Sequence, residues 1–355
     1  MTDRIAAFRE KTLKEGLDAF LVYSDINRNY LSRFTGTSGA VLLTPKGSLF
    51  VTDSRYTLQA QRQVKHAQLQ LQTKSLLVEL ADRLKKSGAR RIGFEAGHMT
   101  VAQHQWLLTQ LPKAKLLPTR GLVESLRLIK DGEEREAMRA AARITDRCIH
   151  HILGFIKPGV AERELAAEME HFMRRQGADG PSFETIVASG WRSALPHGVA
   201  SAKKVEKGDF IVIDFGCRMD GYCSDMTRTV CVGRPSSLQK KVYGIVQRAQ
   251  AAGLNAIRPG KTAGDVDAAC RRLIAKAGYG RRFGHGTGHG VGQEVHEDPR
   301  VGPKAPDVLK AGMAITVEPG IYLDGKFGVR IEDLAFVTEK GHENLYRTTK
   351  DLIVV

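Results

Sequence analysis

The segment FIVIDFGCRMDGYCSDMTRTV, residues 210–230, decides the fold of the C-terminal half. Apolar blocks at 210–215 and 227–232 flank the turn residues Asp220 and Gly221, which predicts two adjacent strands. Asp214 stands at the end of the first strand and Asp225 just before the second, so this turn brings two carboxylates side by side. Like charges this close either share a proton or bind a cation. The alternative is that Asp225 starts a turn and Asp214 caps a strand end.

A second block, GHGTGHGVG at residues 284–292, alternates glycines with histidines and is followed by VHEDPR at 295–300. Its spacing matches neither a dinucleotide-binding loop, nor a P-loop, nor an H-E-x-x-H zinc motif. His285, His289 and His296 fall within twelve residues of a chain that has eleven histidines. Glycines let the backbone pass close to a site while imidazoles project into it, so the block predicts a functional centre.

Two glutamates complete the set of candidate ligands. Glu318 follows the apolar strand residues 314–317 and precedes a Pro-Gly turn, and Glu332 lies between apolar neighbours. Each alone is more often a solvated charge at a strand end. Four buried carboxylates, however, cannot all stay ionised without cations. Carboxylates combined with an imidazole suit manganese, cobalt, iron or zinc, and four carboxylates are enough to bridge two ions.

The pattern of expected strands and helices changes near residue 125. The sequence therefore predicts two domains, at 1–125 and 126–355. The N-terminal half alternates short strands with helices, typical of an α/β domain with a mixed sheet. Its expected strands are 19–23, 39–43, 48–51 and 91–95, and its expected helices are 56–64 and 76–86. The C-terminal half predicts an α+β fold, with helices on one face of a mostly antiparallel sheet. Those helices are expected at 124–151 with a helical stretch through 156, 162–176, 238–256 and 263–277, and further strands at 314–317 and 331–337.

Composition excludes several classes of protein. The chain has 355 residues, of which 42% are hydrophobic and 26% charged, so disorder across its length is excluded. No stretch reaches the roughly 18 apolar residues of a membrane helix, and the N-terminus has no apolar run like a signal peptide. Five cysteines are too few for a disulfide scaffold and favour free thiols in a cytoplasmic protein. The net charge of +15 is scattered in sequence, which disfavours a nucleic-acid partner.

The C-terminal motifs resemble the metallopeptidases of the pita-bread fold, a family that includes methionine aminopeptidase, aminopeptidase P and prolidase. The resemblance rests on the order of five residues, Asp214, Asp225, His289, Glu318 and Glu332. The N-terminal half, with Thr52-Asp53-Ser54-Arg55-Tyr56, is similar to the creatinase-type domain. That long domain and the motifs SDMTRT and GVRIED point to the proline-specific branch rather than to methionine aminopeptidase.

The resemblance implies a role for each residue. Asp225 and Glu332 would bridge two divalent ions, most simply manganese or cobalt, with zinc or iron as alternatives. Asp214 would chelate one ion, and His289 with Glu318 would hold the other, with Glu318 also transferring a proton. The resemblance further assigns substrate-binding histidines and a supporting arginine, namely His197, His285, His296 and Arg330.

The implied activity is hydrolysis of the bond before proline, which releases the N-terminal residue of short peptides with proline at position 2. The implied assembly is a homodimer. A prolidase restricted to Xaa-Pro dipeptides is the alternative, in which Arg300 would bind the dipeptide carboxylate rather than remain solvated. A metal-free binding module and creatinase-like C–N hydrolysis are disfavoured, because all the ligands are present.

Overall fold

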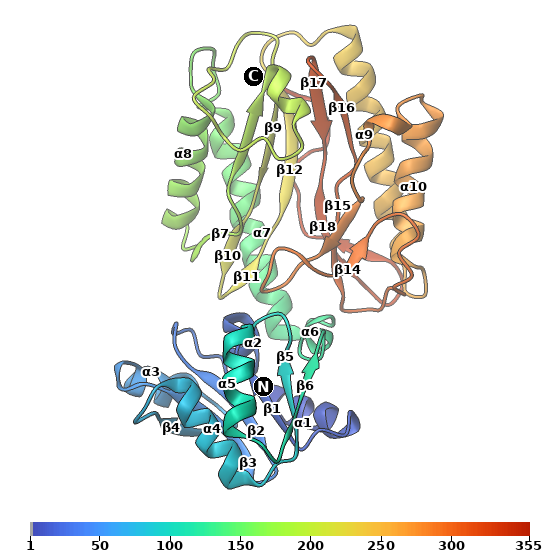
Figure 1. Ribbon diagram of the computed structural model, residues 1–355. Helices are drawn as coiled ribbons and strands as arrows, with labels where there is room; N and C mark the ends of the chain where they lie inside the picture. Colours follow the sequence, from blue (N-terminus) through green and yellow to red (C-terminus); the bar gives the residue numbers. More distant parts are fainter. Residues whose placement is uncertain (1–2) are drawn as a thin grey trace. The chain divides into compact units, whose positions relative to one another are not determined.

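The computed structural model describes residues 3–355, which form two compact units that divide between Arg127 and Leu128 (Figure 1). Within these residues, no helix has both the length and the apolar character needed to cross a membrane.

The N-terminal unit is built on a six-stranded mixed sheet in the order β4-β3-β2-β1-β5-β6. Its strands are β1 (Ala19–Val22), β2 (Ala40–Thr44), β3 (Gly47–Thr52), β4 (Gln68–Leu71), β5 (Arg91–Glu95) and β6 (Lys115–Thr119). Its helices are α1 (Arg4–Lys14), α2 (Asp25–Ser32), α3 (Thr57–Gln63), α4 (Leu76–Ser87), α5 (Val101–Gln110) and α6 (Glu124–Arg127), with a 3₁₀ turn at Ser54–Tyr56.

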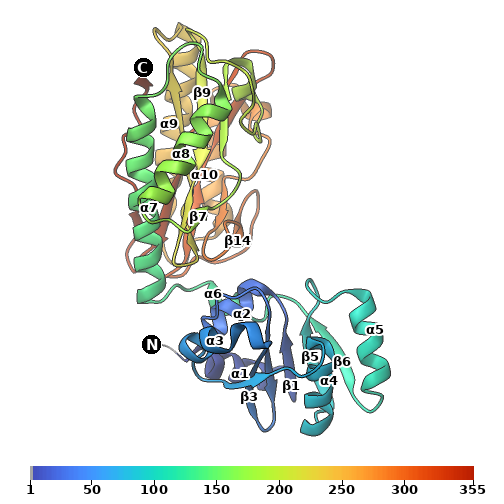
Figure 2. The same cartoon turned by 90° about the vertical axis from the view of Figure 1, so that its left-hand side faces the viewer.

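Both faces of this sheet are apolar, which explains why its central strands lack a polar alternation. Successive side chains of a strand point to opposite faces, so Phe20 and Val22 of β1 join one core and Ala19 and Leu21 the other. Helices α1 to α3 pack on the first face, and α4 and α5 on the second (Figure 2). The predicted α/β domain with a mixed sheet is confirmed.

The C-terminal unit contains two larger sheets of mostly antiparallel strands, in the orders β20-β12-β9-β8 and β14-β13-β15-β18-β19. The first sheet is made of β8 (Ile186–Ser189), β9 (Phe210–Phe215), β12 (Met226–Cys231) and β20 (Ile353–Val354). The second is made of β13 (Gly288–Gly290), β14 (Glu297–Val301), β15 (Ala314–Val317), β18 (Asp333–Val337) and β19 (His342–Asn344). Smaller sheets are formed by β7 (Gly180–Pro181), β10 (Cys217–Met219) and β11 (Tyr222–Cys223), and by β16 (Gly320–Leu323) with β17 (Phe327–Arg330).

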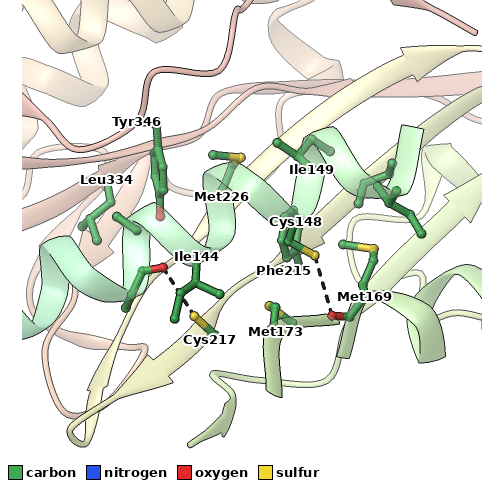
Figure 3. Packing of buried hydrophobic residues seen from close by; sticks show 14 of the residues in the cluster. Ile144, Cys148, Ile149, Met169, Met173, Phe215, Cys217, Met226, Leu334 and Tyr346 are labelled. Atoms are coloured by element: carbon green, nitrogen blue, oxygen red, sulfur yellow. Dashed lines mark hydrogen bonds between the residues drawn. The ribbon is translucent and has the colours of Figure 1, made fainter. Parts of the chain in front are cut away.

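Four long helices cover these sheets, and Figure 1 shows them in two pairs. They are α7 (Gly132–Leu153), α8 (Glu162–Arg175), α9 (Ser237–Ala256) and α10 (Ala263–Lys276), and 3₁₀ turns lie at Gly190–Ala194 and Gly280–Arg282. The first pair packs on a core that includes Cys148 of α7, Met169 and Met173 of α8, and Phe215 of β9 (Figure 3). The second pair packs on a separate core that draws on β15 and β17.

The predicted helix at 124–151 is wrong in one respect, because the chain breaks it into α6 and α7. Asp131 begins α7 with a capping box: its carboxylate accepts from the Glu134 N–H at 3.0 Å, and the Glu134 carboxylate accepts from the Asp131 N–H at 2.8 Å. These two bonds satisfy N–H groups that a new helix leaves open, so a fresh start is stable there. The same helix ends at Leu153, before Gly154, and does not run through Ile156.

Candidate metal centre

The five predicted ligands all line one cavity of about 440 Å³ in the C-terminal unit. The cavity is also lined by the other residues singled out from the sequence, namely His197, His285, His296, Arg300 and Arg330. Residues that are more than 130 positions apart in sequence, such as His197 and Arg330, therefore line the same cavity.

The predicted ligands lie in or directly beside strands of both large sheets. Asp214 lies in β9 and Asp225 directly precedes β12, and these strands pair antiparallel with Asp214 opposite Thr227. The connecting hairpin turns at Asp220 (φ 50°) and Gly221 (φ 80°), the two positive angles that a type I′ turn requires. The second sheet supplies His289 and Glu318, and Glu332 lies between β17 and β18 rather than inside the predicted strand 331–337.

The glycines on either side of His289 are required by close backbone packing. A Cβ atom on Gly288 would lie 2.1 Å from the Thr316 carbonyl oxygen, and one on Gly290 would lie 2.1 Å from that of Asp298. Only glycine allows β13 to fit between β14 and β15 at this spacing. The Gly-His-Gly pattern thus fixes the backbone of His289 between its two neighbouring strands, and its side chain lines the cavity.

The side chains of the predicted ligands lie close enough together that they could hold a cation. The His289 Nε2 lies 3.5 Å from an Asp225 oxygen and 3.4 Å from a Glu318 oxygen. Asp225, His289 and Glu332 each offer a ligand atom within 4.8 Å of the others. Among the described residues, the buried oxygens Asp214 Oδ1 and Glu332 Oε1 have no hydrogen-bond partner. Unpartnered carboxylate oxygens of two residues that line the same cavity fit a divalent ion, which would satisfy them.

The electrostatics of the cluster favour the same interpretation. Burial raises the pKa of Asp225 well above its usual value, and the charges of Glu332 and Asp214 raise it further. Burial and the neighbouring carboxylates, Glu318 foremost, likewise raise the pKa of Glu332. Burial and the charge of Asp214 raise the pKa of Glu318 to about 8, although Arg330 opposes this shift. The cluster therefore takes up protons unless positive charge is supplied.

His289 presents a lone pair to these carboxylates. Its Nδ1 lies 2.9 Å from the Gly290 carbonyl oxygen, which can only accept, so Nδ1 carries the proton and Nε2 is free. Burial lowers the pKa of His289 to about 4, so the ring is neutral near pH 7. A neutral imidazole whose other nitrogen is held by a backbone carbonyl is the usual form of a metal-ligating histidine.

Arg330 supports the site through Tyr322, a residue that the sequence patterns did not single out. The Arg330 guanidinium donates to Asp214 at 2.6 Å and to the Tyr322 hydroxyl at 2.9 Å. That hydroxyl lies 2.9 Å from the Nε2 atom of His285. The Nδ1 atom of the same ring donates to the Gly286 carbonyl at 2.7 Å. The chain of donors runs from Arg330 through Tyr322 to His285, so both nitrogens of His285 are engaged within the protein.

Three side chains at the rim of the cavity remain available to a ligand. His197, His296 and Arg300 are exposed. The His296 ring packs against His289 with centroids 4.4 Å apart, which places it beside the predicted ligands.

A second group of carboxylates and a histidine lies in the N-terminal unit, at Glu95, His98 and Glu124. The Glu95 carboxylate accepts from the backbone N–H groups of Tyr23 at 2.5 Å and Ser24 at 2.8 Å. The amide of Asn27 donates to both glutamates at 2.6 Å. Because these donors already engage both carboxylates, we interpret the group as a network that holds the start of α2.

Comparison with known proteins gives a consistent result. Residues 136–339 match the model of metallopeptidase family M24, and residues 4–129 match the creatinase/prolidase N-terminal domain. An uncharacterized peptidase, YqhT of Bacillus subtilis, is 46% identical and covers 96% of each chain.

Two solved structures share the whole architecture. The Xaa-Pro dipeptidase of Bacillus anthracis is 45% identical with a TM-score of 0.97, over 99% of each chain. The X-Pro aminopeptidase of Thermotoga maritima is 37% identical with a TM-score of 0.91, over 98% of this chain and 100% of the other. These matches confirm the predicted pita-bread fold with a creatinase-type domain. The chain belongs to metallopeptidase family M24 and is a metallo-exopeptidase.

Proposed function

We propose that the protein is an Xaa-Pro dipeptidase that hydrolyses the bond before proline. The observation that carries this proposal is that Arg300 lines the same cavity as the five ligands. A guanidinium at the rim suits the carboxylate of a proline whose amide bond lies at the ligands. Xaa-Pro aminopeptidase activity is the second candidate, because Arg300 is exposed and a solvated arginine would leave room for a longer peptide.

We propose residues 126–355 as the catalytic domain, with Asp214, Asp225, His289, Glu318 and Glu332 as ligands of two divalent ions, manganese or cobalt. The unpartnered oxygens and the raised carboxyl pKa values support this assignment. When bound, such ions supply Lewis acidity, polarising the scissile carbonyl and lowering the pKa of a water molecule.

The protein side chains would supply the proton transfers and orientation. Glu318 can accept a proton from the attacking water and deliver it to the departing proline nitrogen, because its carboxylate faces the cavity. His296 lies at the rim, where an imidazole N–H can donate to the oxygen that gains negative charge. Arg330 donates a hydrogen bond to Asp214, so it orients a predicted ligand and leaves the proton transfers to Glu318 and His296.

The experiment that tests the proposal compares an Xaa-Pro dipeptide with the matching Xaa-Pro-Yaa tripeptide. The protein is stripped with a chelator, reloaded with Mn²⁺ or Co²⁺, and assayed for release of the first residue. We expect cleavage of the dipeptide with little cleavage of the tripeptide. Rapid tripeptide cleavage establishes aminopeptidase activity instead, and cleavage of neither with metal bound excludes both.

Metal binding is expected to stabilise the protein more at pH 8 than at pH 6. The raised pKa values of Asp225, Glu318 and Glu332 mean that the metal-free folded state holds protons which the unfolded state releases near pH 4. The stability of the metal-free protein therefore falls as pH rises from about 4 through the raised pKa values, of which that of Glu318 is about 8. A cation displaces these protons and removes the cost.

Thermal unfolding with EDTA or with Mn²⁺ checks this expectation. The same Mn²⁺ concentration is used at both pH values and is set about 100-fold above the Kd at pH 8. There the ion adds about 2.7 kcal/mol, roughly 5–10 °C in Tm for a unit of this size. We expect the gain in Tm to be larger at pH 8 than at pH 6. An equal gain at both values would contradict the coupled protonation of the cluster.

A further inference from the structure

The C-terminal segment, residues 346–350, contacts the backbone of a predicted bridging ligand through Tyr346. The Tyr346 hydroxyl accepts from the Asp225 N–H at 2.9 Å and donates to the Asp225 carbonyl at 2.6 Å. Tyr346 is only 6% exposed and belongs to the core beneath α7 and α8, where Figure 3 shows it near Leu334. One hydroxyl therefore satisfies both polar groups of the Asp225 backbone, as a neighbouring strand would.

The other predicted bridging ligand, Glu332, is connected to the same segment through Arg228. The Arg228 guanidinium donates to the Glu332 carbonyl at 2.6 Å and to the Asp333 carboxylate at 2.8 Å. It also donates to the carbonyls of Thr348 and Thr349, each at 3.1 Å. Arg228 is 1% exposed, so these contacts are made away from solvent.

The segment is itself firmly attached. Asp146 of α7 accepts from the Arg347 and Thr348 N–H groups at 2.8 and 3.1 Å. Lys350 donates to Asp333 at 2.8 Å, and its carbonyl accepts from the Tyr243 hydroxyl of α9 at 3.0 Å. Helices of both pairs thus fix the segment that holds the two ligands.

We propose that Tyr346 and Arg228 are positioning residues, which hold the backbones of Asp225 and Glu332 so that both carboxylates can face one pair of ions. This inference rests on the proposed metal centre and adds a role for the C-terminal segment. Ligands bind an ion tightly only when their supports fix them within a fraction of an ångström. Loss of such an outer support typically weakens metal affinity by about 10- to 100-fold.

The test is Mn²⁺ binding to the full-length, chelator-stripped Tyr346→Phe variant, measured by calorimetry without substrate. The variant loses one oxygen and keeps the ring that fills the core. We expect Kd for Mn²⁺ to rise about 10- to 100-fold, while near-ultraviolet circular dichroism keeps its wild-type form. The matched control is Tyr243→Phe, which removes another buried hydroxyl of the same segment's contacts, one that donates to the Lys350 carbonyl and not to a predicted ligand. Its Kd is expected to stay within about 3-fold of wild type.

Wild-type affinity in Tyr346→Phe would overturn the inference, as would equal losses in both variants, since general loosening would then be the cause. Absence of Mn²⁺ binding to the wild-type protein would instead overturn the metal centre itself. If Tyr346→Phe does not fold, Arg228→Lys provides the same test. It keeps a positive charge beside Asp333 but loses the fork of donors that reaches both Glu332 and the segment. Unchanged Mn²⁺ affinity in a folded Arg228→Lys protein overturns the inference.

Discussion

The Asp225→Asn variant is expected to lose measurable hydrolysis of Xaa-Pro substrates while keeping its fold. Asp225 is 3% exposed, and its carboxylate lies among His289, Glu318 and Glu332, so an amide there removes one negative charge from the centre of the cluster. The decrease in kcat/KM should exceed the roughly 10- to 100-fold that loss of an outer support causes. Mass spectrometry measures the loss of bound metal, and turnover of an Xaa-Pro dipeptide measures the loss of activity.

Asp220→Asn is the matched control, since it makes the same chemical change at an exposed position of the same hairpin. Asparagine tolerates the positive φ of 50° found there, so folding should not suffer. Full activity of a metal-depleted Asp225→Asn protein would be incompatible with a metal centre at this position.

Replacement of Arg300 by alanine is expected to raise KM for an Xaa-Pro dipeptide by about 10- to 100-fold. A hydrogen bond to a charged group contributes about 1.5–3 kcal/mol, and each 1.4 kcal/mol is a factor of ten. The free carboxylate of a tripeptide lies one residue further from the scissile bond, so its KM should change much less. Steady-state kinetics with the dipeptide and with the tripeptide would measure the two changes in KM.

Arg281→Ala serves as the control, because Arg281 is exposed on the 3₁₀ turn Gly280–Arg282 and does not line the cavity. It should leave both KM values unchanged. Equal effects of Arg300→Ala on the dipeptide and the tripeptide would exclude Arg300 as the group that distinguishes them.

The sequence predicted the elements whose cause is local. The strands around 210–215 and 314–317 follow from short apolar runs, and the helices around 162–176 and 238–256 follow from their periodicity and their Pro or Gly ends. Four of the five candidate ligands stood out because acidic side chains at the ends of apolar strands are costly unless they bind something, and His289 stood out because it lies in a block of alternating glycines and histidines. In the folded protein, all five line one cavity.

The sequence could not predict contacts that depend on the folded arrangement. Tyr322 and Tyr346 look like ordinary core tyrosines, and their partners His285 and Asp225 lie 37 and 121 positions away. The break between α6 and α7 was missed for a different reason. Asp131-Gly132-Glu133-Glu134 carries a capping signal inside a segment otherwise rich in helix-forming residues, and the signal dominates.

The arrangement of ligands on two sheets has a consequence for how the protein matures. Asp214 and Asp225 depend on the pairing of β9 with β12, whereas His289 and Glu318 depend on β13 and β15. Contacts between such distant parts of the chain form late, after the entropy of closing long loops has been paid. A nascent chain that stops before residue 332 lacks one of the five proposed ligands. The ion would therefore enter a nearly finished protein, and the supply of metal in the cell would govern activation and the stability that the bound ion adds.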